Sequence, residues 1–90
     1  MQIEFDTDKR EKTLTERGLD FARAMELFGA PLLTMPDTRI NYGEPRLITF
    51  VLLDSPWTVL VWTPRGAACR IISLKNANDR EIEKFAHRVG

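Results

Sequence analysis

The stretch Arg70-Ile71-Ile72-Ser73-Leu74-Lys75-Asn76-Ala77 leads directly into Asn78-Asp79-Arg80-Glu81. The apolar, β-branched part of this stretch predicts a β-strand that ends in polar and basic residues. Asn78 and Glu81 have the spacing of a capping box, which predicts that a helix starts here. Backbone N–H groups at the start of a helix attract anions. We therefore expect a strand end and a helix start that together could hold a phosphate group.

Two more strands are expected before this one. Residues 46–53 and 57–63 are rich in Leu, Ile, Val, Trp and Thr, and the third strand covers 68–74. Asp54-Ser55-Pro56 and Pro64-Arg65-Gly66 have the composition of turns. Because short turns join antiparallel neighbours, the sequence predicts an antiparallel meander.

Helices are expected before and after these strands in the chain. After a short edge strand over residues 3–5, Asp6 or Thr7 caps a charged helix that runs to Arg17 and stops at Gly18. Asp20 caps a second helix, and the final helix docks on the sheet through a stripe of apolar side chains. We predict an α+β fold of two layers, with two N-terminal helices, an antiparallel meander and a C-terminal helix, in one domain over residues 1–90.

Composition restricts the kinds of function. The chain has 13 basic and 13 acidic residues, with a charge of −2 over residues 1–43 and +2 over residues 44–90, so a nucleic-acid surface would be a local patch. Cys69 and His87 are the only residues of their types, and we expect no disulfide, no metal site and no cofactor. No signal peptide or membrane span is expected, and the predicted location is the cytoplasm.

Basic residues at strand ends are the candidates for chemistry. Regular alternation along the third strand would place Arg70 with Ile72 and Leu74, and Ser73 with Lys75 on the opposite face. Arg70 lies between apolar neighbours, where a guanidinium needs a partner. That partner is either an acid such as Glu44 or the phosphate of a ligand. The alternative reading of other basic residues is that they are surface charges: Arg46, Arg65 and Arg80.

Five blocks in a fixed order resemble a known family. They are Phe5-Asp6 with Lys9, Gly18-Leu19-Asp20-Phe21, Gly43-Glu44-Pro45-Arg46, Val59-Leu60-Val61-Trp62-Thr63, and the Arg70 to Glu81 stretch. Their order and spacing resemble the BrnT family of ribonuclease toxins from type II toxin–antitoxin pairs, whose fold is similar to RelE.

The resemblance implies metal-independent endoribonuclease activity that inhibits translation. In that chemistry a ribose 2′-OH attacks the adjacent phosphate, which requires a base and cations for the developing charge. The resemblance implies that Arg70, Lys75 and Arg46 contact the phosphate and that Glu44 is a candidate base. It also implies a BrnA-type antitoxin in a hetero-oligomeric complex. The residues expected to bind RNA are Lys9, Arg17, Arg65, Ser73 and Arg80.

Some positions depart from the family pattern. The family usually has an Asn-x-x-Lys-His-Gly block after the first helix, and here Glu16 replaces its Lys and Arg17 its His, whereas Gly18 is kept. Arginine keeps a positive charge but cannot readily pass a proton at neutral pH. Two alternatives therefore remain open: a catalytically weakened member that binds antitoxin or RNA, and an unrelated small α+β protein with a structural role.

Overall fold

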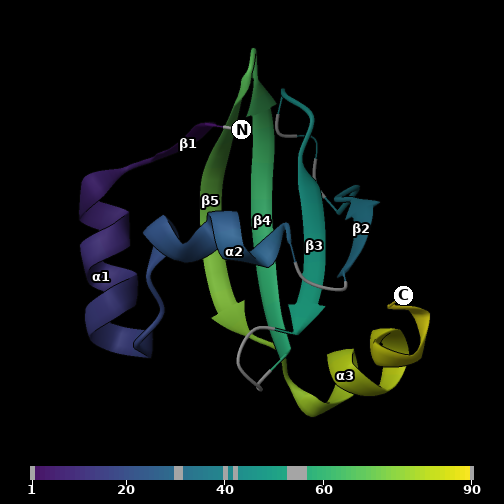
Figure 1. Ribbon diagram of the computed structural model, residues 1–90. Helices are drawn as coiled ribbons and strands as arrows, with labels where there is room; N and C mark the ends of the chain where they lie inside the picture. Colours follow the sequence, from purple (N-terminus) through teal and green to yellow (C-terminus); the bar gives the residue numbers. More distant parts are fainter. Residues whose placement is uncertain (1, 30–31, 40, 42, 53–56, 90) are drawn as a thin grey trace.

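The computed structural model describes residues 2–29, 32–39, 41, 43–52 and 57–89. It confirms the α+β class: five strands form one sheet, and helical segments pack around it (Figure 1). The composition also predicts turns at residues 36–38 and 41–43, on either side of Arg39 and Ile40. Ile40, Tyr42 and the expected turn at 54–56 lie outside the described residues. In chain order the elements are β1 (Gln2–Phe5), α1 (Thr7–Arg17), the 3-10 helix η1 (Phe21–Arg23), α2 (Ala24–Leu27), β2 (Leu32–Pro36), β3 (Leu47–Leu52), β4 (Trp57–Arg65), β5 (Ala68–Asn76), α3 (Asp79–Phe85) and the 3-10 helix η2 (Ala86–Arg88).

The predicted antiparallel meander is present as β3, β4 and β5, but the whole sheet is mixed and is not a simple meander. The strand order is β1-β5-β4-β3-β2, in which β2 to β5 are antiparallel neighbours and β1 pairs parallel with β5. A hairpin turn joins only antiparallel strands, so a parallel pair needs a longer connection. Here the connection between β1 and β5 contains all the elements that lie between them in the chain. The hairpin between β4 and β5 is also tighter than expected. Pro64 and Arg65 still belong to β4, and the turn occurs at Gly66, where φ is 57°.

The first predicted helix is confirmed. The carboxylate of Asp6 accepts hydrogen bonds from the N–H groups of Asp8 and Lys9, and Gly18 ends α1 with a φ of 71°. The second predicted helix is instead one 3-10 turn followed by the short α2. The spacing of Phe21, Ala24, Met25 and Phe28 predicted an apolar stripe on this helix. Phe21 and Ala24 are buried and Phe28 is partly buried, but Met25 stays 49% exposed.

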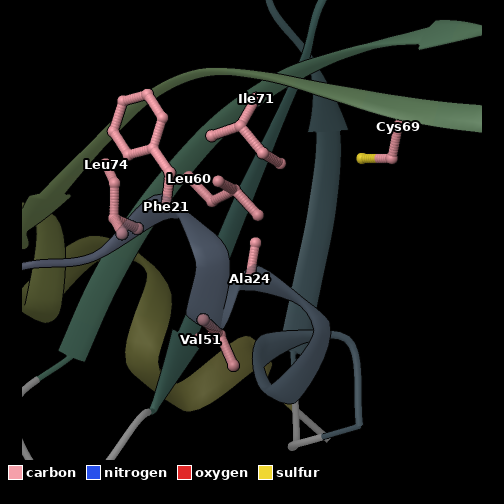
Figure 2. Packing of buried hydrophobic residues seen from close by; sticks show 7 residues of the cluster. All are labelled: Phe21, Ala24, Val51, Leu60, Cys69, Ile71 and Leu74. Carbon is pink, nitrogen blue, oxygen red and sulfur yellow. The ribbon is translucent and has the colours of Figure 1, made fainter. Parts of the chain in front are cut away.

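The main core lies between the η1–α2 segment and one face of the sheet, which we call the helix face. Phe21 and Ala24 are fully buried there against Leu60, Ile71 and Leu74, as Figure 2 shows. Two further side chains, Val51 and Cys69, complete the buried cluster. Burial raises the pKa of the Cys69 thiol to about 11, so this side chain is an uncharged core group at neutral pH.

Side chains of opposite alternation form the other face of the sheet, which we call the open face. The ring of Phe50 lies there, stacked on Trp57 at 4.9 Å between centroids and tilted against Phe85 of α3 at 5.9 Å. Helical segments therefore pack on both faces, and the expected arrangement of two layers was wrong. The capping box of Asn78 and Glu81 starts α3 directly after β5. Phe85 of this helix then packs on Phe50, which places α3 on the open face.

Candidate functional site

A β-bulge in β5 decides which of its side chains share a face. Val61 of β4 is opposite Ser73, but the next residue, Trp62, is opposite Ile71, so Ile72 is an extra residue in β5. Arg70 and Ser73 consequently lie on the open face together with Lys75. The expectation of regular alternation, with Arg70 and Leu74 on one face, was wrong. Leu74 is instead buried on the helix face.

A pocket of about 420 Å³ opens on this face between β5, β4 and α3. Its floor is apolar and consists of Ile48, Val59 and Val61, with Met35 and Phe85 at the sides. Polar and charged side chains complete the lining, namely Arg17, Arg39, Ser73, Lys75 and Glu81. The pocket thus combines an apolar floor with three cations and one carboxylate.

The ion pair between Lys75 and Glu81 fixes one wall of the pocket. Lys75 Nζ donates to Glu81 Oε1 at 3.0 Å, and the N–H of Asn78 donates to the same oxygen at 3.0 Å. Burial acts to raise the pKa of Glu81, but these two hydrogen bonds and the charge of Arg39 outweigh it, so the pKa lies below its ordinary value of 4.5. The capping box also uses the N–H groups of Asn78 and Glu81, so these two are not free for the anion that the sequence suggested.

We expect this carboxylate to make stability depend on pH. Because the pKa of Glu81 is lowered by folding, its contribution is present above pH 4.5 and is lost as the pH falls through the folded-state pKa. Glu81→Gln should lower the free energy of unfolding by about 1 kcal/mol at pH 7. Urea titrations of both proteins from pH 7 to pH 3 should show this difference shrinking towards zero. A difference that stays constant with pH would contradict the prediction.

Two basic side chains of α1 satisfy backbone carbonyls at the edge of β5. β1 covers this edge only along Ala68–Ile71. Beyond it, Lys9 Nζ donates to the carbonyl of Ile72 at 3.3 Å, and Arg17 donates to the carbonyl of Leu74 at 2.9 Å. A second hollow of about 210 Å³ lies beneath α1, and it shares Arg17 and Ser73 with the first pocket. The remaining residues of its lining are Lys9, Lys12, Thr13, Glu16, Phe21 and Ile72.

The other predicted site residues form separate groups. Glu44 lies between Arg46 and Arg65, at 3.7 Å and 3.5 Å. Arg70 is 3.9 Å from Glu4 of the neighbouring strand β1. The acidic side chain beside Arg70 is therefore Glu4, and not Glu44 as the sequence suggested.

The structure therefore collects only part of the predicted set in one pocket. Arg17, Ser73 and Lys75 line the pocket together, whereas Arg70 and the group around Glu44 do not belong to its lining. Arg80 is exposed on α3, and Lys9 lies in the hollow beneath α1.

Comparison with protein families connects this chain to a known group. A family model described as "Ribonuclease toxin, BrnT, of type II toxin-antitoxin system" matches residues 5–81. The chain belongs to the BrnT family. Of the residues that line the pocket, all but Phe85 lie within the match. A comparison with curated proteins finds no match. The place of BrnT in type II systems implies a ribonuclease toxin with a protein antitoxin as its partner.

Two charged residues of the pocket were not among the predicted site residues. Arg39 was read as part of a turn, although its bidentate ion pair with the buried Asp37, at 2.8 Å to each oxygen, fixes it beside the pocket. Glu81 was read only as the capping residue of α3. Its spacing from Lys75, across a strand end and a helix start, was the signal that could have indicated a pocket wall.

No helix among the described residues is long and apolar enough to cross a membrane. Within the same part of the chain, no three or more His, Cys, Asp and Glu side chains gather where they could hold a metal ion.

Proposed function

We propose that this BrnT protein is a metal-independent endoribonuclease that inhibits translation in the cytoplasm and is held inactive by a BrnA-type antitoxin. The observation that carries the proposal is the bulge at Ile72, which puts Arg70, Ser73 and Lys75 on one face of the sheet. An RNA strand crossing this face would meet both cations and the hydroxyl from a single strand of the protein. Fixed cations of this kind stabilise the charge of a phosphorane without any reorganisation during the reaction.

Arg70 is the proposed centre of phosphate recognition. Its planar guanidinium can donate two parallel hydrogen bonds to a phosphate. The contact with Glu4 is long at 3.9 Å, and the Arg70 side chain is 31% exposed, so little must be broken before RNA binds. In the proposed reaction, Arg46 adds a second positive charge. Lys75, which carries three N–H donors, protonates the departing 5′-oxygen.

Glu44 is the proposed proton acceptor for the attacking 2′-OH. Its carboxylate has Arg46 and Arg65 on either side and is 30% exposed, so it is accessible from solvent while both ion pairs are in place. Attack on the phosphate then yields a 2′,3′-cyclic phosphate on one fragment and a 5′-hydroxyl on the other. The RNA-binding residues proposed to flank this reaction are Lys9, Arg17, Arg65, Ser73 and Arg80.

The chemistry is tested by cleaving RNA in the presence of EDTA. We expect the purified protein to cut single-stranded RNA at an unchanged rate when divalent ions are chelated. The fragments should carry 5′-hydroxyl ends, which polynucleotide kinase labels without prior phosphatase treatment. Cleavage that stops in EDTA and returns with Mg²⁺, or fragments with 5′-phosphate ends, would overturn the metal-independent mechanism.

A second candidate function is supported by one specific contact. Arg17 stands where the family usually has histidine, and it donates to the carbonyl of Leu74. An arginine in this role anchors α1 and does not exchange a proton. The chain could then act as an RNA-binding or antitoxin-binding module with weak catalysis. Growth that continues normally when the protein is well expressed without antitoxin would favour this function over the nuclease.

The antitoxin proposal is supported by the surface of α1. None of the side chains of α1, all of which the structure describes, is buried, and Leu14 is 40% exposed. A partner segment lying along α1 would cover this leucine and the adjacent basic hollow. We expect co-expression with a BrnA-type antitoxin to give a hetero-oligomer in size-exclusion chromatography with light scattering. Leu14→Asp should weaken that complex at least tenfold, and an unchanged affinity would exclude α1 as the contact.

A further inference from the structure

We propose that the pocket between the sheet and α3 holds one unpaired nucleobase of the RNA, and that Glu81 selects bases that carry an exocyclic amino group over uracil. This inference rests on the proposed ribonuclease function and adds a specificity-determining residue to it. Three observations support it: the apolar floor of the pocket, the basic hollow that adjoins it, and the unequal use of the two oxygens of Glu81.

The floor of the pocket suits the flat, apolar surface of a base. Ile48, Val59 and Val61 lie side by side on neighbouring strands, and the ring of Phe85 borders the same space. Proteins that read single-stranded RNA place bases against aromatic and aliphatic side chains in this way. A volume of about 420 Å³ is sufficient for a small ligand group and lies within the usual range of ligand pockets. A phosphate alone would gain nothing from this floor.

The charged side chains stand where the sugar–phosphate backbone would leave the pocket. Arg17 and Ser73 belong both to the pocket and to the hollow beneath α1, so the two spaces adjoin there. The hollow adds Lys9 and Lys12, which can attract the next phosphate along the strand. Base and phosphate thus have separate places, one apolar and one basic, on either side of Arg17.

Glu81 is fixed in position by two hydrogen bonds, and one of its carboxylate oxygens can still accept a hydrogen bond from a ligand. Its Oε1 takes the hydrogen bonds of Lys75 and of the Asn78 N–H, whereas Oε2 takes none from any residue that the structure describes. A carboxylate only accepts hydrogen bonds, and it accepts them well from the amino group of cytosine or adenine. Uracil presents carbonyl oxygens on both sides of its single N–H, and these oxygens repel the carboxylate. The wall of the pocket therefore discriminates by hydrogen-bonding pattern and not by size.

The test uses RNA that cannot be cut, so that binding is measured apart from cleavage. Fluorescein-labelled 2′-O-methyl pentamers of sequence UUXUU, with cytosine, adenine or uracil at X, are titrated with the full chain and followed by anisotropy. We expect the wild type to bind the cytosine and adenine pentamers about tenfold more tightly than the uracil pentamer. Glu81→Gln should lose this preference, because the amide of glutamine can donate to a uracil carbonyl.

A matched control separates this role from charge and folding. Glutamine is compatible with the capping box, so Glu81→Gln should keep α3. Glu83→Gln removes the same charge from an exposed position of α3 and should keep the preference. Equal binding of the three pentamers by the wild type, no measurable binding of any of them, or an equal effect of the two variants would overturn the base pocket.

The outcomes also distinguish this inference from the function on which it rests. A base preference without cleavage of ordinary RNA would leave the pocket standing and would remove the nuclease. Cleavage of ordinary RNA without any base preference would leave the nuclease standing and would remove the role of Glu81.

Discussion

Arg70→Ala is expected to reduce RNA cleavage by roughly 10²–10³-fold, because removing one fixed donor to a charged transition state has an effect of this size in other enzymes. The bulge at Ile72 places this guanidinium on the open face, and Lys75 lies on the same face. Arg70→Lys should recover only part of the activity, since lysine cannot donate two parallel hydrogen bonds to a phosphate.

The role proposed for Arg70 requires that Arg70→Ala lowers the cleavage rate without unfolding the protein. The contact of Arg70 with Glu4 is partly exposed and 3.9 Å long, and such pairs contribute about 0–1 kcal/mol. Urea denaturation should therefore show near-wild-type stability for Arg70→Ala. Arg23→Ala is the matched control, because Arg23 belongs to η1 and pairs with Glu26 on an exposed surface. Full toxicity of a well-folded Arg70→Ala in expressing cells would refute the role assigned to Arg70.

Phe21→Ala is expected to lower the free energy of unfolding by about 3–5 kcal/mol. Phe21 is 1% exposed, stands at the centre of the helix-face cluster and has its ring edge-on to Phe5 at 6.1 Å. Domains have only about 5–15 kcal/mol of stability in total. The variant should consequently be partly unfolded at 37 °C, with a much lower midpoint in urea.

The neighbouring Met25 provides the control for this substitution. Met25→Ala removes a comparable apolar side chain from the same short segment, but Met25 is 49% exposed. Its urea midpoint should stay close to that of the wild type. Similar midpoints for Phe21→Ala and Met25→Ala would show that the η1–α2 segment does not anchor the core.

Local signals in the sequence predicted local structure well. Asp6 and Gly18 marked both ends of α1, and Asn78 with Glu81 marked the start of α3, because capping depends on residues only a few positions apart. The pairing of β1 with β5 carries no such signal. It joins Gln2 to Ala68, and nothing in the composition of either segment identifies the other.

The candidate site was harder to predict than the fold because it depends on a change of register. Ile71 and Leu74 are both buried on the helix face, although they are three positions apart, and only an extra residue between them makes this possible. No glycine marks the position. Regular alternation therefore wrongly placed Arg70 on the face opposite to Ser73 and Lys75. The pocket itself also needed Arg39, whose position follows from its contact with Asp37.

The parallel pairing of β1 with β5 also sets the order of events during synthesis. The ribosome makes β1 before its partner strand, which begins only at Ala68, so β1 cannot pair until the residues between them and β5 itself have been translated. At translation rates of about 5–20 residues per second this delay lasts several seconds. Arg70, Ser73 and Lys75 emerge within the same late segment. A nascent chain therefore lacks this set of side chains until Lys75 has been added to it.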